Sequence, residues 1–306
     1  MFGEWVTLRE TAAYKHDVHN MKTGETLENC AVTGMDGEQA GWLRPSPENG
    51  GTVYGKDRIV YADGTSSTQT YDALTDFKDG KAVVNVDGKT IRAIDTTGKT
   101  LWSMNFAFDR SKLAVEAGAG ERIVMTNSNS TSYTLIAGGK RIASSSGGLY
   151  LNQYSDTYIY SENTGYYALY NFKGKKLTKT YQNAFDEVGQ NIYSRWINDK
   201  EYEYIRCDAD GTNKVLFRVK PILNGGRPGL LATDGAGVYA LPTDEHTITC
   251  FDRFGATLGT IKIEDTIDIY YRLSFENGCL RVVDSYPNGK TDAVNALYLP
   301  TGEQIS

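Results

Sequence analysis

The chain has 306 residues, of which 40% are hydrophobic and 23% charged, and its formal net charge at pH 7 is −6. This composition can fill a sizeable core and excludes a wholly disordered chain. The acidic balance, without any run of basic residues, argues against nucleic acid as the main partner, and no apolar stretch is long enough to span a membrane.

Short β-rich runs separated by Gly, Asn and Asp recur along the chain, and no segment longer than ten residues keeps a helical period. The best helical candidate, 110–117, runs directly into Gly118-Ala119-Gly120. In chain order, the clearest strand-like runs are 81–86, 122–125, 157–160, 237–241 and 279–283. This pattern predicts an all-β chain.

A strand, a short polar turn ending in Gly and a second strand recur with a mean period near 40 residues. Tight hairpin turns need a positive φ, which favours Gly. The predicted turn glycines are Gly24, Gly64, Gly98, Gly139, Gly174, Gly211, Gly255 and Gly302. Four short strands per period of this length are typical of a β-propeller blade.

We therefore predict one β-propeller domain of seven or eight four-stranded blades, with eight favoured by the hairpin count. The expected units are 1–29 (partial), 30–72, 73–107, 108–145, 146–181, 182–221, 222–262 and 263–306. Residues 1–29 offer only two or three strands, so they could instead complete the C-terminal blade as a closing strap, leaving seven blades. In the unit 146–181, the expected strands are 148–154, 157–161, 166–171 and, as the outer edge, 175–180.

Two stretches resemble the repeats of known propeller families. Residues 77–99 resemble a WG-type bacterial repeat, without its Trp-Gly pair and with one inserted residue. Residues 93–102 (AIDTTGKTLW) are similar to the docking motif of quinoprotein-like propellers, one residue short. The second resemblance implies that Trp102 packs between blades and plays a structural role, so that Trp102→Ala would cost roughly 3–5 kcal/mol. Nothing in the sequence supports a bound quinone, and we expect no cofactor.

The residues that usually carry metal or nucleophilic chemistry are sparse. The sequence has no HExxH motif and no GxSxG motif, and its Cys residues form no CxxC pair. Segment 208–213 (DADGTN) has the alternating oxygen ligands of a calcium loop, but it lacks the distal Glu and lies where a hairpin turn is expected. We therefore expect no metal site and interpret the thiols as buried or free. The His and Cys residues considered for metal or nucleophilic chemistry are His16, His19, His246, Cys30, Cys207, Cys250 and Cys279.

Segment 46–53 (SPENGGTV) resembles the Asp-box of sialidase-type propellers, with Glu48 in place of the Asp and Val53 in place of the Trp. Segment 161–165 resembles the Asp-box more weakly. In that family the box shapes a turn and performs no catalysis, so the resemblance implies a structural role.

The predicted blades also indicate where a ligand would bind. If the Gly turns share one face, the segments that lead into the inner strands lie on the opposite axial face, where propellers usually bind. Aromatic rings and Arg side chains there suit sugar faces, carboxylates and protein hot spots. The candidate ligand-binding residues are Trp42, Arg44, Arg110, Tyr154, Arg195, Trp196, Arg227, Tyr271 and Arg272.

Together these observations predict a non-catalytic binding module that recognises a protein or a glycan at that axial face. The alternative is a glycan-active hydrolase or lyase of the sialidase-like propeller type, with Asp186, Asp234 and Glu276 as the first carboxylates to inspect. A purely structural spacer is a third possibility. We expect a monomer that binds no nucleic acid and does not insert into membranes. A removed leader would place it on the surface or outside of a bacterial cell, and a native Met1 would place it in the cytoplasm.

Overall fold

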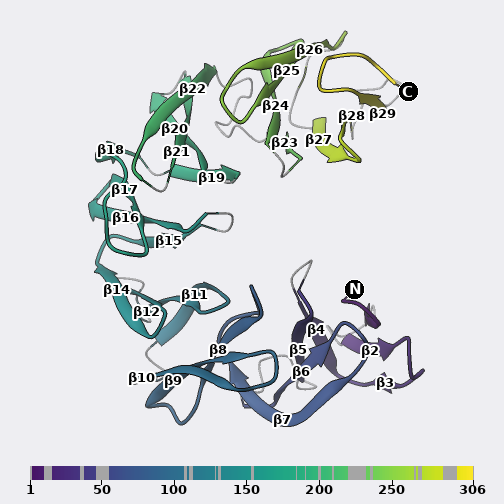
Figure 1. Ribbon diagram of the computed structural model, residues 1–306, viewed down its shortest axis with the longest axis vertical. Helices are drawn as coiled ribbons and strands as arrows, with labels where there is room; N and C mark the ends of the chain where they lie inside the picture. Colours follow the sequence, from purple (N-terminus) through teal and green to yellow (C-terminus); the bar gives the residue numbers. More distant parts are fainter. Residues whose placement is uncertain are drawn as a thin grey trace. The chain divides into compact units, whose positions relative to one another are not determined.

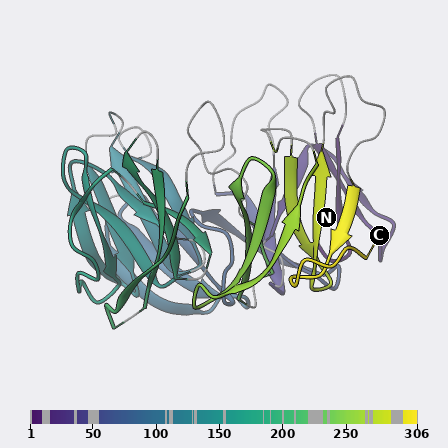
Figure 2. The same ribbon diagram turned by 90° about the horizontal axis from the view of Figure 1, so that it is seen from above.

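The structure is a computed structural model, and every regular element in it is a β-strand (Figures 1 and 2). It contains no helix with the length and hydrophobicity needed to cross a membrane, within the residues that it describes. Those residues are 2–9, 16–34, 38–45, 55–106, 109, 113–127, 129, 132–152, 155–183, 185–189, 191–198, 201–208, 210–219, 232–234, 237–264, 267, 271–284 and 295–305.

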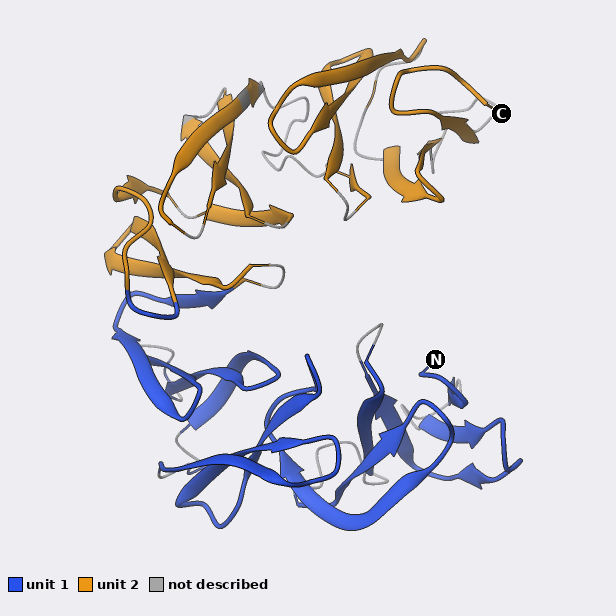
Figure 3. Cartoon of the chain, viewed as in Figure 1, with its two compact units in different colours: residues 1–151, 172–174 blue, residues 152–171, 175–306 orange. Residues whose placement is uncertain are grey.

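The chain divides into two compact units, residues 1–151 with 172–174, and residues 152–171 with 175–306 (Figure 3). The strands of the first unit are β1 (Trp5–Arg9), β2 (His16–Asn20), β3 (Thr26–Leu27), β4 (Cys30–Thr33), β5 (Ala40–Pro45), β6 (Asp57–Tyr61), β7 (Ser66–Ala73), β8 (Lys81–Asn85), β9 (Thr90–Asp95), β10 (Thr100–Asn105), β11 (Leu113–Ala119), β12 (Arg122–Asn127), β13 (Tyr133–Ala137), β14 (Lys140–Ser145) and β15 (Leu149–Leu151). Those of the second unit are β16 (Thr157–Asn163), β17 (Tyr166–Asn171), β18 (Tyr181–Gln182), β19 (Phe185–Gly189), β20 (Ile192–Asn198), β21 (Glu201–Cys207), β22 (Asn213–Val219), β23 (Ala232–Thr233), β24 (Val238–Asp244), β25 (Thr247–Asp252), β26 (Thr257–Lys262), β27 (Tyr271–Glu276), β28 (Cys279–Asp284) and β29 (Asn295–Tyr298).

Strands that follow one another along the chain are neighbours in each sheet. The middle strands are buried on both faces, as in β25 (TITCFD), whereas the outer strand β26 is largely exposed and polar. A strand covered on both faces needs a continuous run of β-formers and apolar residues, which explains the short apolar runs in the sequence.

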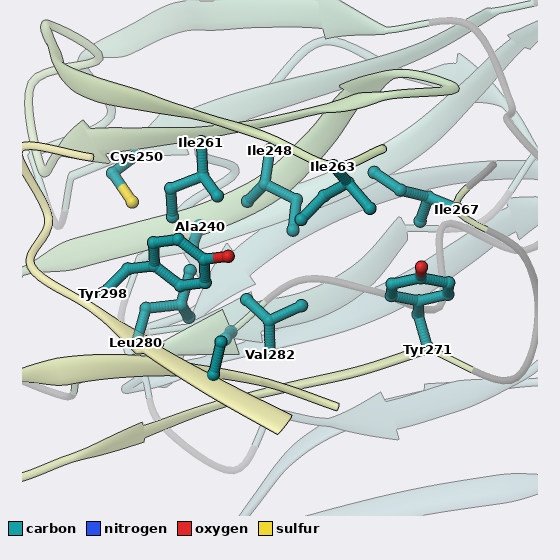
Figure 4. Close-up of a cluster of buried hydrophobic side chains, with 12 residues drawn as sticks. Ala240, Ile248, Cys250, Ile261, Ile263, Ile267, Tyr271, Leu280, Val282 and Tyr298 are labelled. Carbon is teal, nitrogen blue, oxygen red and sulfur yellow. The ribbon is translucent and has the colours of Figure 1, made fainter. Parts of the chain in front are cut away.

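Within each unit, consecutive sheets pack face to face. In the second unit, Ile248 and Ile261 of the β23–β26 sheet meet Leu280 and Val282 of the β27–β29 sheet in one buried cluster (Figure 4). In the first unit, Val83 and Ile91 share a cluster with Ile123 of the next sheet. Consecutive meanders stacked face to face are the blades of a β-propeller. The predicted all-β, β-propeller class is confirmed.

The predicted number of blades is wrong. The described residues form six sheets of blade size, β1–β3, β11–β14, β15–β18, β19–β22, β23–β26 and β27–β29, and only four of these have four strands. The strands β4 to β10 form a single seven-stranded sheet. Within the first unit, β1–β3 form a sheet of their own, and the alternative of a strap completing the C-terminal blade stays a prediction.

The seven-stranded sheet arises because the end of β7 pairs with β8, Asp72 with Asn85 and Ala73 with Val84. Beyond β7, the Leu74 amide donates to the Val83 carbonyl at 2.9 Å, and the Lys78 amide donates to the Lys81 carbonyl at 3.0 Å. The strand β7 therefore lies between β6 and β8 and joins two groups of strands into one sheet. No Gly or Pro interrupts 66–78.

One further strand differs from expectation. In the unit 146–181, β15 and β17 lie within the predicted ranges and β16 extends beyond its predicted end at 161 to Asn163, but the edge strand is Tyr181–Gln182 instead of 175–180. The segment 175–180 still hydrogen-bonds to β17: the Leu177 amide donates to the Leu169 carbonyl at 2.8 Å, and the Leu169 amide donates to the Thr178 hydroxyl at 3.1 Å. The treatment of 1–306 as a single domain stays a prediction.

The predicted hairpin turns are confirmed at all eight glycines, whose φ angles lie between 73° and 97°. The turn at Gly255 shows the geometry. The Gly255 amide donates to the Asp252 carbonyl at 2.9 Å, and the Asp252 carboxylate accepts from the amides of Phe254 and Ala256, each at 2.8 Å. A residue with a Cβ would be strained at this positive φ.

Trp102, on β10, lies against the next sheet, as the quinoprotein-like resemblance implies. Its indole nitrogen donates to a carboxylate oxygen of Glu121 at 3.0 Å. A Cβ added at Gly139, in the turn between β13 and β14, would lie 3.3 Å from Trp102. The close approach of this turn covers part of the indole, and the side chain is half-buried.

We expect Trp102→Ala to lower the free energy of unfolding by about 2 kcal/mol, less than for a fully buried Trp because only part of the ring is covered. Urea unfolding measures the change. The matched variant Trp102→Phe retains the apolar contact with Gly139 and should recover about half of the loss. A loss below about 0.5 kcal/mol for Trp102→Ala would contradict the structural role.

Candidate functional site

Two of the predicted ligand-binding residues lie in the core. Trp42 is fully buried, and its indole nitrogen donates to the Thr75 carbonyl at 2.8 Å. Tyr271 is 1% exposed and belongs to the cluster between the last two sheets (Figure 4). Side chains enclosed in this way stabilise the fold and offer no surface to a ligand.

Three other candidates are accessible and lie in separate places. Arg44 forms an ion pair with Asp76 at 2.9 Å. Trp196 is half-buried and packs on Tyr202 with 4.2 Å between ring centroids. Arg272 is exposed on β27 and donates to the Tyr271 carbonyl at 2.9 Å. Arg110, Tyr154, Arg227 and the Asp-box-like segment 46–53 lie outside the described residues.

The three candidate carboxylates belong to three different sheets. Asp186 is exposed on β19. Asp234 follows β23, and its carboxylate accepts from the amides of Gly237 and Val238, each at 2.8 Å. Glu276 ends β27 and lies 3.4 Å from Arg281. Glycoside hydrolysis requires a pair of facing carboxylates, and the glycan-active alternative stays a hypothesis.

We next consider possible metal ligands and the buried thiols Cys207 and Cys250 in the part of the chain that the structure describes. No group of three or more His, Cys, Asp or Glu residues there could hold a metal ion. Asp208, in the calcium-loop-like segment, is paired with Arg206 at 2.8 Å. Burial, with a smaller effect of Asp208, raises the pKa of Cys207 to about 12, and burial raises that of Cys250 to about 11. Both thiols stay protonated near neutral pH and are poor nucleophiles.

Arg195 is the predicted candidate that lies in a cluster of charges. It belongs to β20 and is the register partner of Glu203 on β21, which is in turn the partner of Arg218 on β22. Directly opposed residues on neighbouring strands point to the same face of a sheet. The strand pairing therefore aligns two guanidinium groups on either side of one carboxylate, and we call this row the arginine ladder.

The carboxylate at the centre of the ladder is almost completely enclosed, with 3% of the Glu203 side chain exposed. One of its oxygens accepts from Arg195 Nε at 2.9 Å and lies 2.6 Å from Arg195 Nη2. The other accepts from Arg218 Nε at 3.0 Å and from Nη2 at 2.9 Å. These charge-assisted bonds fix both guanidinium groups and use only two of the three nitrogens of each.

An aromatic ring from the neighbouring sheet completes the cluster. The Arg195 guanidinium lies 4.0 Å from the centroid of the Tyr181 ring, and the Lys179 ammonium lies 5.0 Å from it. Burial raises the pKa of the Tyr181 hydroxyl, against the opposing effect of the Arg195 charge. The phenol therefore stays neutral, and the cluster holds three cations and one carboxylate.

The arginine ladder lies toward the end of its sheet that the sequence predicts for binding. Glu203 is near the start of β21, whereas the Gly211 turn follows the opposite end of that strand. Arg218 is the accessible member of the ladder, with 55% of its side chain exposed. The arrangement can bind an anionic group through guanidinium nitrogens that Glu203 leaves unused.

Sequence reasoning identified Arg195 and missed Glu203, Arg218 and Tyr181. The only signal was the alternation of Glu and Tyr at 201–204, which puts an acidic residue inside a strand of large buried side chains. Glu203 faces two arginines because of the strand register, which the sequence does not reveal.

A second, partly buried carboxylate, in the segment 161–165 that weakly resembles an Asp-box, has a structural role. Glu162 accepts from the Tyr170 hydroxyl at 2.5 Å, lies 2.6 Å from Lys176 Nζ, and also accepts from the Thr180 hydroxyl. Burial alone would raise its pKa, but the hydrogen bonds from Lys176, Thr180 and Tyr170 outweigh burial and lower it to about 2.

We expect Lys176→Gln to make the fold more sensitive to acid. The Glu162 carboxylate has an ordinary pKa of 4.5, so its stabilising contribution is present above that pH and is lost as the pH falls toward 2. Removing Lys176 raises the folded-state pKa, so the loss begins at a higher pH. Urea unfolding between neutral pH and about pH 3 measures this difference, and parallel stability curves for variant and wild type would contradict it.

The fold and this site define a β-propeller protein with a cation-rich, aromatic surface cluster. No protein-family model and no curated protein matches the sequence. Many solved structures are similar to this chain, including three at low identity. The computationally designed Ika8 protein is 14% identical, covering 91% of this chain and 90% of its own, with a TM-score of 0.42.

BamB from Moraxella catarrhalis is 10% identical, covering 93% of this chain and 95% of its own, with a TM-score of 0.39. A eukaryotic initiation factor is 10% identical, covering 100% of this chain and 85% of its own, with a TM-score of 0.41. Similarities of this size support no inference about the function of this chain.

Proposed function

We propose that this protein is a non-catalytic binding module that recognises a protein or glycan ligand through an anionic group at the arginine ladder. The observation that carries the proposal is the excess of positive charge around Glu203, together with the exposure of Arg218. A carboxylate, sulfate or phosphate group matches the planar fork of an arginine.

The geometry favours binding over a purely structural role for Arg218. Arg195 is 14% exposed and already supplies one positive charge to the buried carboxylate. Arg218 adds a second positive charge in a chain whose net charge is −6, so the local excess is not a general property of the surface. Glu203 also holds Arg218 in place before a ligand arrives, which reduces the entropy lost on binding.

The proposal is tested with an array of unmodified neutral and carboxylate-bearing glycans and with polyglutamate peptides. We expect binding of acidic members without turnover. Arg218→Gln should weaken that binding about ten-fold. Arg281→Gln, which removes a partly exposed arginine from another sheet, is the matched control and should leave it unchanged.

Equal binding by the wild type and Arg218→Gln would rule out the arginine ladder as the site. Release of shorter glycans during the assay would instead support the hydrolase or lyase alternative, and variants of Asp186, Asp234 and Glu276 would then identify its acids.

A further inference from the structure

The eight Gly turns provide an internal comparison, because the same backbone turn recurs with different side chains. The residue before the turn glycine is aromatic at one turn, where Phe254 precedes Gly255. At the other turns it is Thr23, Asp63, Thr97, Gly138, Lys173, Asp210 and Thr301. The Phe254 side chain is 50% exposed. The turn itself does not require an aromatic residue, so this exposed ring needs another explanation.

Cationic side chains surround this ring. The Arg253 guanidinium lies 4.9 Å and the Arg206 guanidinium 5.2 Å from the ring centroid. The Lys214 ammonium donates to the Phe254 carbonyl at 2.7 Å, and Arg206 Nη1 donates to the Arg253 carbonyl at 3.3 Å. These contacts bring β21, β22 and the β25–β26 turn together. We call Arg206, Lys214, Arg253 and Phe254 the Phe254 surface.

The acidic residues beside this surface are already engaged. Asp208 pairs with Arg206, and the Asp252 carboxylate accepts from backbone amides of its own turn. Within the described part of the chain, no carboxylate forms an ion pair with Arg253 or Lys214. An apolar ring therefore stands beside two cations that lack acidic partners there.

We propose that the Phe254 surface docks an acidic, apolar-containing segment of a protein partner. The exposed ring would contact an apolar side chain of that segment, and Arg253 and Lys214 would pair with its Asp or Glu residues. Exposed aromatic residues flanked by arginine are characteristic of interface hot spots. A peptide that alternates acidic and apolar residues matches both features, whereas a neutral glycan would leave the cations unpaired.

This docking surface is independent of the arginine ladder. Arg206 lies near the end of β21 that leads to the Gly211 turn, and Glu203 lies nearer the other end of that strand. The Phe254 surface therefore sits on the Gly-turn end of these two sheets, where the sequence predicted no binding.

The test uses the whole chain and labelled peptides that alternate glutamate and leucine, with fluorescence anisotropy as the readout. We expect the acidic peptide to bind and a lysine–leucine peptide of the same length not to bind. Phe254→Thr, which installs the residue found at three equivalent turns, should weaken binding about thirty-fold. Arg253→Gln should weaken binding and reduce its dependence on salt.

Two controls separate docking from folding and from the arginine ladder. Leu101→Thr removes another exposed apolar side chain, on β10, and should leave binding unchanged. Because the arginine ladder would also take an acidic peptide, Phe254→Thr is measured a second time in an Arg218→Gln background, where it should still weaken binding about thirty-fold. Urea unfolding of Phe254→Thr should match the wild type. The proposal fails if the acidic peptide does not bind the wild type, if it binds Phe254→Thr equally well, or if the basic peptide binds as tightly.

Discussion

Trp42→Ala is expected to lower the free energy of unfolding by about 3–5 kcal/mol, the range for deletion of a fully buried aromatic side chain. Trp42 has no exposed surface, and its ring centroid lies 4.9 Å from that of Phe77 and 5.7 Å from that of Tyr71. The variant would leave a cavity in this cluster and an unpaired carbonyl at Thr75, which accepts from the indole nitrogen.

Urea unfolding followed by tyrosine fluorescence measures the loss. Trp42→Phe is the matched variant, because it keeps an aromatic ring in the cluster but removes the hydrogen bond, and it should lose clearly less stability. The folded fraction of either variant should bind acidic ligands like the wild type. Normal stability combined with lost binding would return Trp42 to the set of ligand-binding residues.

Glu203→Gln is expected to destabilise the protein by about 3 kcal/mol, the lower end of the range for breaking a buried ion pair. The substitution keeps the shape of the side chain and removes the negative charge between Arg195 and Arg218. The loss falls at the lower end because Arg218 is more than half exposed and can turn toward water.

The control for this prediction is Glu276→Gln, which neutralises an exposed glutamate beside Arg281 and should change stability by less than about 0.5 kcal/mol. Urea unfolding at low and high salt distinguishes the two sites, because the enclosed ladder is screened less than the surface pair. A loss below about 1 kcal/mol for Glu203→Gln would show that the enclosed carboxylate contributes little to stability.

Features of the fold that depend on local backbone chemistry could be predicted from the sequence. The eight turn glycines all have positive φ, because few other residues adopt that conformation cheaply. The number of blades could not be predicted in the same way. The pairing of Asp72 and Ala73, at the end of β7, with Asn85 and Val84 of β8 joins two groups of strands into one sheet, and no residue pattern in the sequence marks it.

The candidate site was predicted only in part, because side-chain burial and strand register are properties of the folded chain. Aromatic residues such as Trp42 and Tyr271 look alike in sequence whether they fill a core or meet a ligand, and both are buried here. Arg195 was identified by its position near a loop. Glu203 lies eight residues from Arg195 and fifteen residues from Arg218 along the chain. Only the pairing of β20, β21 and β22 brings the three side chains together.

The pairing of β7 with both β6 and β8 determines where this chain can be divided. In an array of modules that contact only their neighbours, a cut between modules normally removes a loop and few hydrogen bonds. A cut after Ala73 would instead separate β7 from β8 and place the paired residues Asp72 and Asn85, and Ala73 and Val84, on different fragments. Exposed edges of that kind promote aggregation. Truncated proteins should therefore retain 30–105 as one indivisible piece, with chain ends placed outside it.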